Sequence, residues 1–258
     1  MKPGLLAALA GALLVYFVWT RTASAADAAD SGDAGGEGGS APDDGEDPTP
    51  MAPTRPTVYQ GAYAWTADLV IDADGAPGAY APHGGLDALA NAGHPGRWWG
   101  LVTDDGTPAG TPVVADDGNY VSSTALVDRA YGRTDPRRYV DASTICYLAV
   151  GRDVLSAMGA QLGDLAWCTN PRTGKSAGAI VADIAPRGRF HEGSIALAEA
   201  LGGSGNPRSG GLAEVQYVVF PGTAAGWPRS DYQSAAEAAF WAWGGTDALA
   251  HALSPGGS

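Results

Sequence analysis

The sequence predicts a strand-rich α+β domain with few helices. Short apolar runs are separated at close intervals by Gly, Pro, Asn and Asp, and this spacing is typical of strands joined by turns. The chain of 258 residues contains 38 Gly and 18 Pro, so such breaks are frequent. Only three segments have the pattern of a helix, and no internal repeat is present. These features favour one strand-rich core with many loops.

The expected strands are apolar runs of five to eight residues, each bounded by turn-forming residues. In chain order they are 64–71, 98–102, 120–127, 145–150, 164–168, 177–182 and 215–220.

The expected helices are 86–92, 194–201 and 232–243. Ser194 is a good helix cap, Ile195, Leu197 and Leu201 form an apolar face behind it, and Gly202 ends the segment. The last helix follows a cap at Ser230 or Asp231 and is rich in Ala, Phe and Trp. The helices are therefore expected to be short and few.

The first 25 residues are typical of a secretory signal peptide. An apolar run at 4–19 follows Met1-Lys2, and Ala23-Ser24-Ala25 matches a small-residue cleavage site. Arg21 lies between the run and that site, so an uncleaved N-terminal membrane anchor is the alternative, although the run is short for a span of about 20 residues. The sequence thus predicts a secreted protein, with no membrane partner unless the leader is retained.

Residues 26–57 form an acidic segment that is expected to be a disordered linker. It carries eight acidic residues, one Arg and almost no large apolar residue. The remaining domain, 58–258, has 20 acidic and 12 basic side chains, a formal charge of −8. This charge argues against a nucleic-acid partner and favours a neutral or cationic one. Solubility alone is the competing explanation.

The two cysteines, Cys146 and Cys168, lie in apolar segments that are predicted to be neighbouring strands. In an exported chain we expect a structural disulfide between them, with a pair of buried thiols as the alternative.

Two carboxylates near position 190 suggest a chemistry. Asp183 ends the buried run 179–182, and Glu192 precedes the helix that starts near Ser194, with a tight loop between them. Inverting glycoside hydrolysis needs such a pair, because one carboxyl group protonates the leaving oxygen while the other activates water roughly 6.5–9.5 Å away. The alternative is purely local: Asp183 makes a turn and Glu192 favours a helix start.

Other catalytic patterns are absent from the sequence. The histidines have no metal-ligand spacing, and neither a His-Glu-x-x-His nor a paired Cys-x-x-Cys motif occurs. No Gly-x-Ser-x-Gly nucleophile motif is present, and the Gly-rich stretch 202–211 follows a helix, unlike a phosphate loop. We therefore expect no metal and no cofactor, and paired carboxylates remain as the enzymatic hypothesis. The four histidines are His83, His94, His191 and His251.

Several stretches of the chain, in the same order, resemble the chitosanases of glycoside hydrolase family 75 and together cover nearly all of 58–221. They are Ile71-Asp72-Ala73-Asp74-Gly75-Ala76-Pro77 with Ala79-Tyr80, the segments 85–93, 98–100, 120–126 and 139–142, the Asp183 to Glu192 region, and Tyr217-Val218-Val219-Phe220-Pro221-Gly222.

This resemblance implies a monomeric, endo-acting, inverting enzyme that hydrolyses β-1,4 links between glucosamine units. Its polymer partner would be chitosan or partly deacetylated chitin, and Asp183 and Glu192 match the family's two essential carboxylates. The chain departs from the family at one point, because His191 stands where Gly is frequent before the Glu. A His beside the carboxylate puts the pH optimum in doubt.

A more distant likeness concerns the fold. The succession of strand, Asp, Pro turn, acid-x-Ser and helix is similar to the core of double-psi β-barrels, such as rare lipoprotein A, the expansins and family 45 cellulases. In that likeness Glu192 corresponds to the acid two residues before the Ser. The same relatives provide alternative functions: a peptidoglycan lytic transglycosylase, or a non-hydrolytic expansin-like protein that binds polysaccharide.

A cationic polysaccharide should meet carboxylates that face its amines and aromatic rings that face its sugars. The candidate substrate-binding residues are Asp72, Asp74, Tyr80, Trp98, Trp99 and Tyr120. Each has a structural alternative: the two Asp residues only shape a hairpin turn, one of two adjacent Trp on a strand must face the core, and Tyr120 only begins a strand. Asp72-x-Asp74-Gly75 also resembles part of a calcium loop but lacks its later ligands.

The division of roles between the two carboxylates is open at this point. The higher reference pKa of Glu and the likeness to family 45 favour Glu192 as the acid and Asp183 as the base. A helix N-terminus would instead stabilise the Glu192 anion, as a base requires. The balance leans narrowly to Glu192 as the acid.

Overall fold

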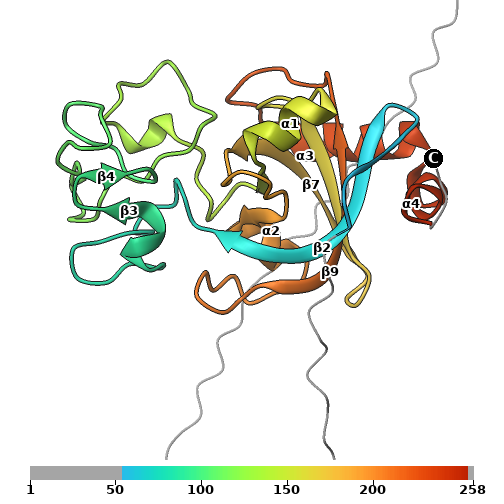
Figure 1. Ribbon diagram of the computed structural model, residues 1–258, viewed down its shortest axis with the longest axis horizontal. Helices are drawn as coiled ribbons and strands as arrows, with labels where there is room; N and C mark the ends of the chain where they lie inside the picture. Colours follow the sequence, from blue (N-terminus) through green and yellow to red (C-terminus); the bar gives the residue numbers. More distant parts are fainter. Residues whose placement is uncertain (1–53, 255–258) are drawn as a thin grey trace, which may run out of the picture. The chain divides into compact units, whose positions relative to one another are not determined.

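A computed structural model of the chain describes residues 54–254 (Figure 1). The predicted leader and nearly all of the predicted linker lie outside the described residues. Thr54 is joined to Thr66, whose main-chain N–H donates to the Thr54 Oγ1 at 2.8 Å. Ordered pairing thus begins at least four residues before the predicted domain start at 58. Within residues 54–254, no helix combines the length and the apolar character that crossing a bilayer requires.

The core of the domain is a closed barrel of six strands, in the order β2, β8, β5, β7, β6, β9, with β9 pairing back onto β2. This confirms the predicted strand-rich α+β class. Two of the pairs are parallel (β2 with β8, β5 with β7) and the other four are antiparallel, a mixture compatible with a double-psi barrel. The short β1 pairs with the first part of β2. The strands are β1 (Thr57–Tyr59), β2 (Ala62–Asp72), β5 (Tyr147–Ala149), β6 (Leu165–Asn170), β7 (Lys175–Asp183), β8 (Glu192–Ser194) and β9 (Leu212–Phe220).

Strand β7 is central to this barrel and is buried from Ala177 to Asp183. Its two faces are covered differently, because the barrel interior fills one side and a helix, α3 (Tyr232–Trp243), contacts the other. Gly178 marks the close approach: a Cβ at this position would lie 2.6 Å from the main-chain oxygen of Gln233. A strand enclosed in this way has a continuous apolar sequence, which made it recognisable.

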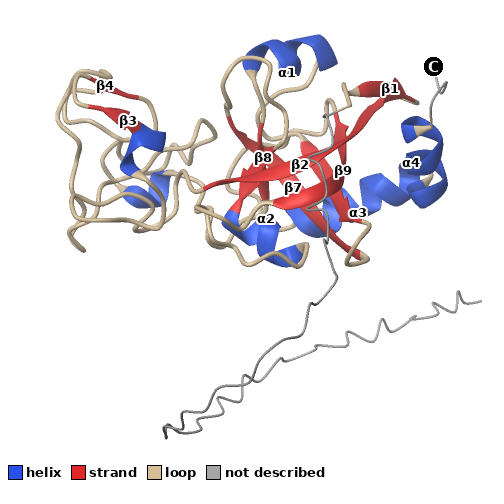
Figure 2. Cartoon of the chain, turned by 60° about the horizontal axis from the view of Figure 1, so that its bottom comes forward, coloured by secondary structure: helices blue, strands red, loops and turns tan. Residues whose placement is uncertain are grey.

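Within residues 54–254, four α-helices pack around the barrel (Figure 2). The helix predicted at 232–243 matches α3, and the one at 194–201 matches α2, where the Ser194 Oγ accepts the Leu197 N–H at 3.1 Å. Two helices were not predicted, because α1 begins after Gly151 without a side-chain cap and α4 follows α3 directly through Gly244, which has φ 117°. The other three helices are α1 (Arg152–Met158), α2 (Ile195–Ala200) and α4 (Gly245–Leu253).

The segment between β2 and β5, residues 73–146, forms a loop-rich region beside the barrel, at the left of Figure 1. Its regular elements are β3 (Gly93–His94), β4 (Arg97–Trp98) and the 3-10 turns η1 (Leu89–Ala92) and η2 (Pro136–Arg138). The predicted strands 98–102 and 120–127 are therefore largely wrong, since beyond β4 they form only isolated bridges. The predicted helix 86–92 is reduced to η1. Val102, Val121 and Tyr139 form a small separate cluster here, while other apolar residues of the region, such as Tyr80 and Leu101, join the main core.

The predicted disulfide is wrong, because Cys146 and Cys168 are both free and buried. They do not lie on neighbouring strands. Cys168 pairs with Ala177 on one side of β7. Cys146 lies just before β5, on the other side of β7, where its main-chain oxygen accepts the Ile180 N–H. Two strand spacings amount to roughly 9.6 Å, whereas a disulfide needs Cα atoms within about 7 Å. The alternative of two buried thiols is the one that the structure shows.

Candidate active site

The strand register places Asp183 and Glu192 on either side of one residue. Ala149 of β5 pairs with Asp183 of β7 and also with Glu192 of β8. The two carboxylate residues are thus two strand spacings apart, roughly 9.6 Å between Cα atoms. The register shifts between Leu148 and Ala149, a β-bulge of the kind that re-aims a side chain beside a site. The two side chains therefore reach the site from strands that are not adjacent.

Both carboxylates line one pocket of about 520 Å³ where the barrel meets the loop-rich region. The end of β2, the loop that follows β7, and residues of the loop-rich region contribute to its wall. Of the predicted site residues, the pocket brings together Asp72, Asp74, Tyr80, Trp99, Asp183 and Glu192.

Asp183 is buried, with 8% of its surface exposed. Its Oδ1 accepts two main-chain N–H groups, from Ala125 at 2.9 Å and from Ile184 at 2.8 Å. Burial raises the pKa of Asp183 to about 6, and the nearby charge of Glu192 adds to the increase, while the two hydrogen bonds and Arg152 oppose it. Asp183 is therefore a fixed carboxyl group that can carry a proton in mildly acidic solution.

Glu192 opens the three-residue strand β8, and helix α2 begins three residues later at Ile195. Its carboxylate accepts a hydrogen bond from the Arg189 guanidinium, with 3.1 Å between Oε1 and Nη1. The adjacent Gly193 is needed for space, since a Cβ there would lie 2.9 Å from a methyl group of Leu197. Glu192 is thus fixed at the pocket wall by an ion pair with the loop that joins it to Asp183.

Asp72 and Asp74 lie at the end of β2, beside Asp183. One carboxylate oxygen from each of these three residues lies within 4.8 Å of the others. The Asp72 Oδ1 accepts the Asp74 N–H at 2.9 Å, and the Asp74 Oδ1 accepts the Tyr80 hydroxyl at 2.8 Å. Burial first, and then repulsion by Asp183, raises the pKa of Asp72 to about 8, and burial with repulsion by Asp72 raises the pKa of Asp74 well above its usual value.

These three carboxylates are also the group, among the described residues, whose spacing could hold a metal ion. Hard cations prefer such oxygen ligands, but usually in sets of six or more that include carbonyl groups or water. The hydrogen bonds from Tyr80 and from Ser122, at 3.4 Å, already occupy one oxygen of Asp74. The expectation of a metal-free protein stays a prediction.

The two adjacent tryptophans point in different directions. Trp99 is 58% exposed at the pocket, and its indole N–H donates to the main-chain oxygen of Asn91 at 2.7 Å, so that its polar edge is satisfied while the ring stays accessible. Trp98 is 7% exposed, belongs to the core and does not line this pocket. Of the pair, Trp99 is the one placed to meet a sugar ring.

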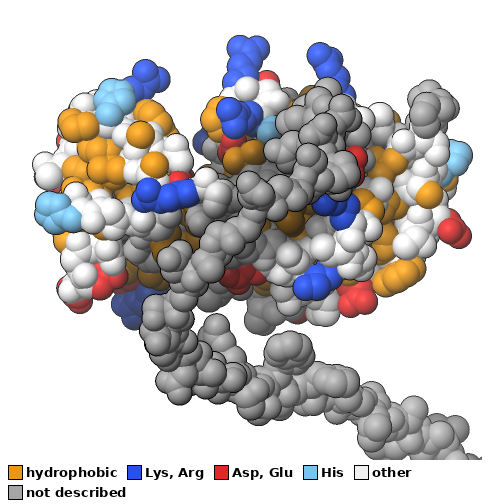
Figure 3. All heavy atoms as spheres, turned by 90° about the horizontal axis from the view of Figure 1, so that it is seen from below, with side chains coloured by type: hydrophobic (Ala, Val, Ile, Leu, Met, Phe, Trp, Pro, Cys, Tyr) orange, Lys and Arg blue, Asp and Glu red, His pale blue; other side chains and the backbone are white. Residues whose placement is uncertain are grey.

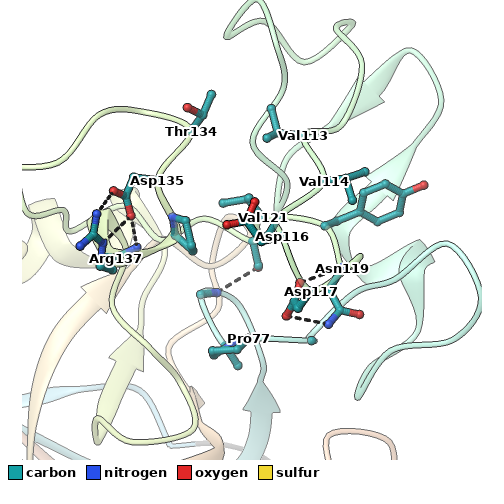
Figure 4. A pocket seen from close by; sticks show the side chains of 17 residues that line it. Pro77, Val113, Val114, Asp116, Asp117, Asn119, Val121, Thr134, Asp135 and Arg137 are labelled. Atoms are coloured by element: carbon teal, nitrogen blue, oxygen red, sulfur yellow. Dashed lines mark hydrogen bonds and ion pairs between the residues drawn. The ribbon is translucent and has the colours of Figure 1, made fainter.

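Tyr120 lies in a second and larger pocket, of about 710 Å³ (Figure 4). The loop that follows Asp74 forms a wall of this pocket, and Asp116, Asp117 and Asp135 line it, with Asp135 paired to Arg137 at 2.6 Å. Sequence reasoning placed Tyr120 with the other substrate residues, whereas the structure separates it from the two catalytic candidates.

Three residues of the site were not predicted. Arg189 lies in the short loop between the two carboxylates. Its position three residues before Glu192 is a sequence signal from which the ion pair between them was predictable. Tyr147 donates its hydroxyl to the main-chain oxygen of Asp74 at 2.9 Å, and Ser122 reaches the same aspartate from 48 positions away. Contacts across such separations have no local sequence signal.

The acidic side chains are not gathered on the exposed face that Figure 3 shows, where red carboxylates and blue basic groups are interspersed. Acidic side chains do lie together in the pocket that holds Asp72, Asp74, Asp183 and Glu192. No protein-family model and no curated protein sequence matches the chain. The resemblance to family 75 therefore stays a prediction, and any function must be argued from the site itself.

Proposed function

We propose that the protein is a secreted, endo-acting glycoside hydrolase that cleaves β-1,4 links between glucosamine units of chitosan with inversion. The observation that carries this proposal is the register around Ala149, which sets Asp183 and Glu192 two strands apart in one pocket. That separation suits a carboxylic acid on one side of the scissile bond and a water-activating carboxylate on the other. The residues that resemble family 75 add independent support.

Asp183 acts as the general acid and Glu192 as the general base, the reverse of the assignment that reference pKa values favour. A general acid must carry a proton at the working pH, and burial raises the pKa of Asp183 to about 6. A base must be positioned to take a proton from water, and the ion pair with Arg189 holds the Glu192 carboxylate at the pocket wall. Asp183 would protonate the glycosidic oxygen while Glu192 removes a proton from the water that attacks the anomeric carbon.

The pocket wall favours a cationic sugar polymer. Five carboxyl groups line the pocket, and one of them, Glu192, forms an ion pair with Arg189. The ammonium group of an amino sugar therefore brings positive charge into an acidic pocket. The exposed ring of Trp99 offers a face for the apolar side of a pyranose. A neutral glucan would gain only the second of these interactions.

A panel of polymers tests this proposal. Purified protein is incubated with highly deacetylated chitosan, chitin, cellulose and peptidoglycan sacculi, and new reducing ends and soluble fragments are measured. We expect reducing ends from chitosan above all, with a rapid fall in viscosity because cleavage is internal. Release of anhydro-muropeptides from sacculi would instead identify a lytic transglycosylase. Co-sedimentation with a polymer but no new reducing ends would identify an expansin-like binding protein.

A further inference from the structure

Asp72 and Asp74 form an acidic pair that the two catalytic roles do not use. Both line the pocket, and each brings a carboxylate oxygen within 4.8 Å of the other and of Asp183. Three negative charges at this spacing repel one another strongly in a partly buried site, so at least one of them is neutral in the free protein at neutral pH.

The groups that face this pair supply hydrogen bonds but no positive charge. Asp74 receives the hydroxyl groups of Tyr80 and Ser122, and the Tyr147 hydroxyl binds its main-chain oxygen. Asp183 and Glu192 face the pair from β7 and β8, and both are acidic. Asp87 also lines the pocket, and both of its carboxylate oxygens accept from the Asn91 amide nitrogen. The nearest bases serve other carboxylates, since Arg189 binds Glu192 and Arg152 acts on Asp183.

We propose that Asp72 and Asp74 bind the ammonium group of one glucosamine unit, and that this ammonium displaces a proton that the pair holds in the free protein. This inference rests on the proposed function and identifies the group on the substrate that the site recognises. The carboxylic acid loses its proton to solvent, the carboxylate that forms accepts hydrogen bonds from the ammonium, and the pocket charge is unchanged overall. The high pKa of Asp72, about 8, agrees with a proton being present before the sugar arrives.

Selectivity follows from this exchange. An N-acetylated sugar or a plain glucose unit has no positive charge at this position, so it cannot stabilise the carboxylate that would form. Such a sugar would meet a neutral acid pair and gain no charge-assisted hydrogen bond. The sugar next to the cleaved bond should therefore need a free amine, whereas sugars farther along the chain need not.

Asparagine substitutions separate the titration from the structural role. The amide oxygen of an Asn at position 72 can still accept the Asp74 N–H, and one at position 74 can still accept the Tyr80 hydroxyl. The variants are Asp72→Asn alone and Asp72→Asn with Asp74→Asn. Asp116→Asn is the matched control, because Asp116 is an exposed residue of the second pocket. Circular dichroism and thermal unfolding show which variants are folded.

Isothermal titration calorimetry with a glucosamine tetramer measures the exchange. All proteins carry Glu192→Gln to prevent turnover, and binding enthalpies at about pH 6 are compared in buffers with different ionisation enthalpies, which reports the protons released. We expect the double variant to release about one proton fewer than the parent, the single variant to show part of that loss, and Asp116→Asn to show none. The N-acetylglucosamine tetramer and cellotetraose should bind at least about tenfold more weakly to the parent, equivalent to 1.4 kcal/mol or more.

Equal proton release by the parent and both Asn variants would overturn the ammonium site. Equal affinity of the parent for the three tetramers would overturn it as well. These outcomes are distinct from failure of the proposed function. If wild-type protein releases no reducing ends from chitosan while the Asn variants still lose proton release, the hydrolase proposal falls and the ammonium site stands. If hydrolysis is observed and the variants release as many protons as the parent, the hydrolase proposal stands and the ammonium site falls.

Discussion

The barrel and the loop-rich region, residues 73–146, keep their shape by different means. In the barrel, six strands share continuous ladders and a common core. In the loop-rich region, isolated bridges and turns replace the ladders, and side chains add hydrogen bonds to the main chain: Asp104 accepts the N–H of Thr111, and Asp141 accepts that of Ser143. The two regions contribute differently to the site, because barrel strands position Asp183 and Glu192, and the loops add Tyr80 and Trp99 to the wall of the same pocket.

The largest effect should come from the two barrel carboxylates. Asp183→Asn and Glu192→Gln should each lower chitosan hydrolysis by at least about a hundredfold, because positioned acids and bases contribute roughly 10² to 10⁴ in rate. Release of reducing ends by proteins of unchanged circular dichroism measures this. Glu237→Gln, an exposed change on α3, should keep full activity. If either carboxylate variant kept more than half of the wild-type rate, that residue would have no catalytic role.

The same two variants also test which group is the acid. Asp183→Asn should recover much of its rate on a glucosamine oligomer with an aryl leaving group, because that group departs without protonation. Glu192→Gln should not recover on this substrate, since water still needs a base. The opposite pattern would return the acid role to Glu192.

A second test compares the packing of the two regions. Gly178→Ala in β7 should lower the free energy of unfolding by about 1–3 kcal/mol, because the new methyl group would meet the main chain of Gln233. Gly132→Ala in the loop-rich region should be within about 0.5 kcal/mol of wild type, since no atom lies within 4 Å of that Cβ position. Urea denaturation gives both values. Equal effects at the two positions would show that the barrel is no more tightly packed than the loops.

A third test concerns the junction between the regions. The pKa of Asp72 is raised from 3.8 to about 8, so the folded state holds a proton that the unfolded state has lost across this range. Stability should therefore fall as pH rises from about 4 to about 8. Asp72→Asn removes this contribution and should gain more than about 1.4 kcal/mol relative to wild type between pH 5 and 8, the equivalent of one pKa unit. A difference that is independent of pH would contradict the raised pKa.

The smallest effect should come from the wall that the loops supply. Trp99→Ala removes an exposed ring whose stacking on a sugar is worth about 0.5–1.5 kcal/mol, so KM for chitosan should rise about two- to twelvefold with kcat little changed. Trp241→Ala is the matched control, because Trp241 is equally exposed, at 57%, and lies outside the active-site pocket. Steady-state kinetics on both variants decides the point. If the two changes had the same effect, Trp99 would not be a substrate contact.

Sequence reasoning was accurate where structure depends on local pattern. The runs 64–71, 177–182 and 215–220 are apolar and bounded by turns, and each lies within an observed strand. It failed at β8, whose residues Glu-Gly-Ser carry no strand pattern, and in the loop-rich region, where apolar residues fill the small cluster of Val102, Val121 and Tyr139. In both cases tertiary contacts decide the conformation.

The candidate site likewise has features that were predictable from local sequence and features that depend on the tertiary fold. Asp183 and Glu192 were recognisable from neighbouring elements, and Asp72 and Asp74 from the end of a strand. The separation of Trp98 from Trp99 and the displacement of Tyr120 to another pocket depend on how the loop-rich region folds. The failed disulfide has a similar origin, because the order of β5, β7 and β6 in the barrel is not visible in the sequence.

Proton NMR of an early chitosan digest tests the central claim most directly. If Asp183 and Glu192 act as acid and base from two strands apart, water attacks the face opposite the leaving group and the new reducing ends appear first as the α anomer. The β anomer should then grow only at the rate of spontaneous mutarotation. New ends that appear first as β would mean retention through a covalent intermediate and would contradict the account, as would the absence of any new reducing end.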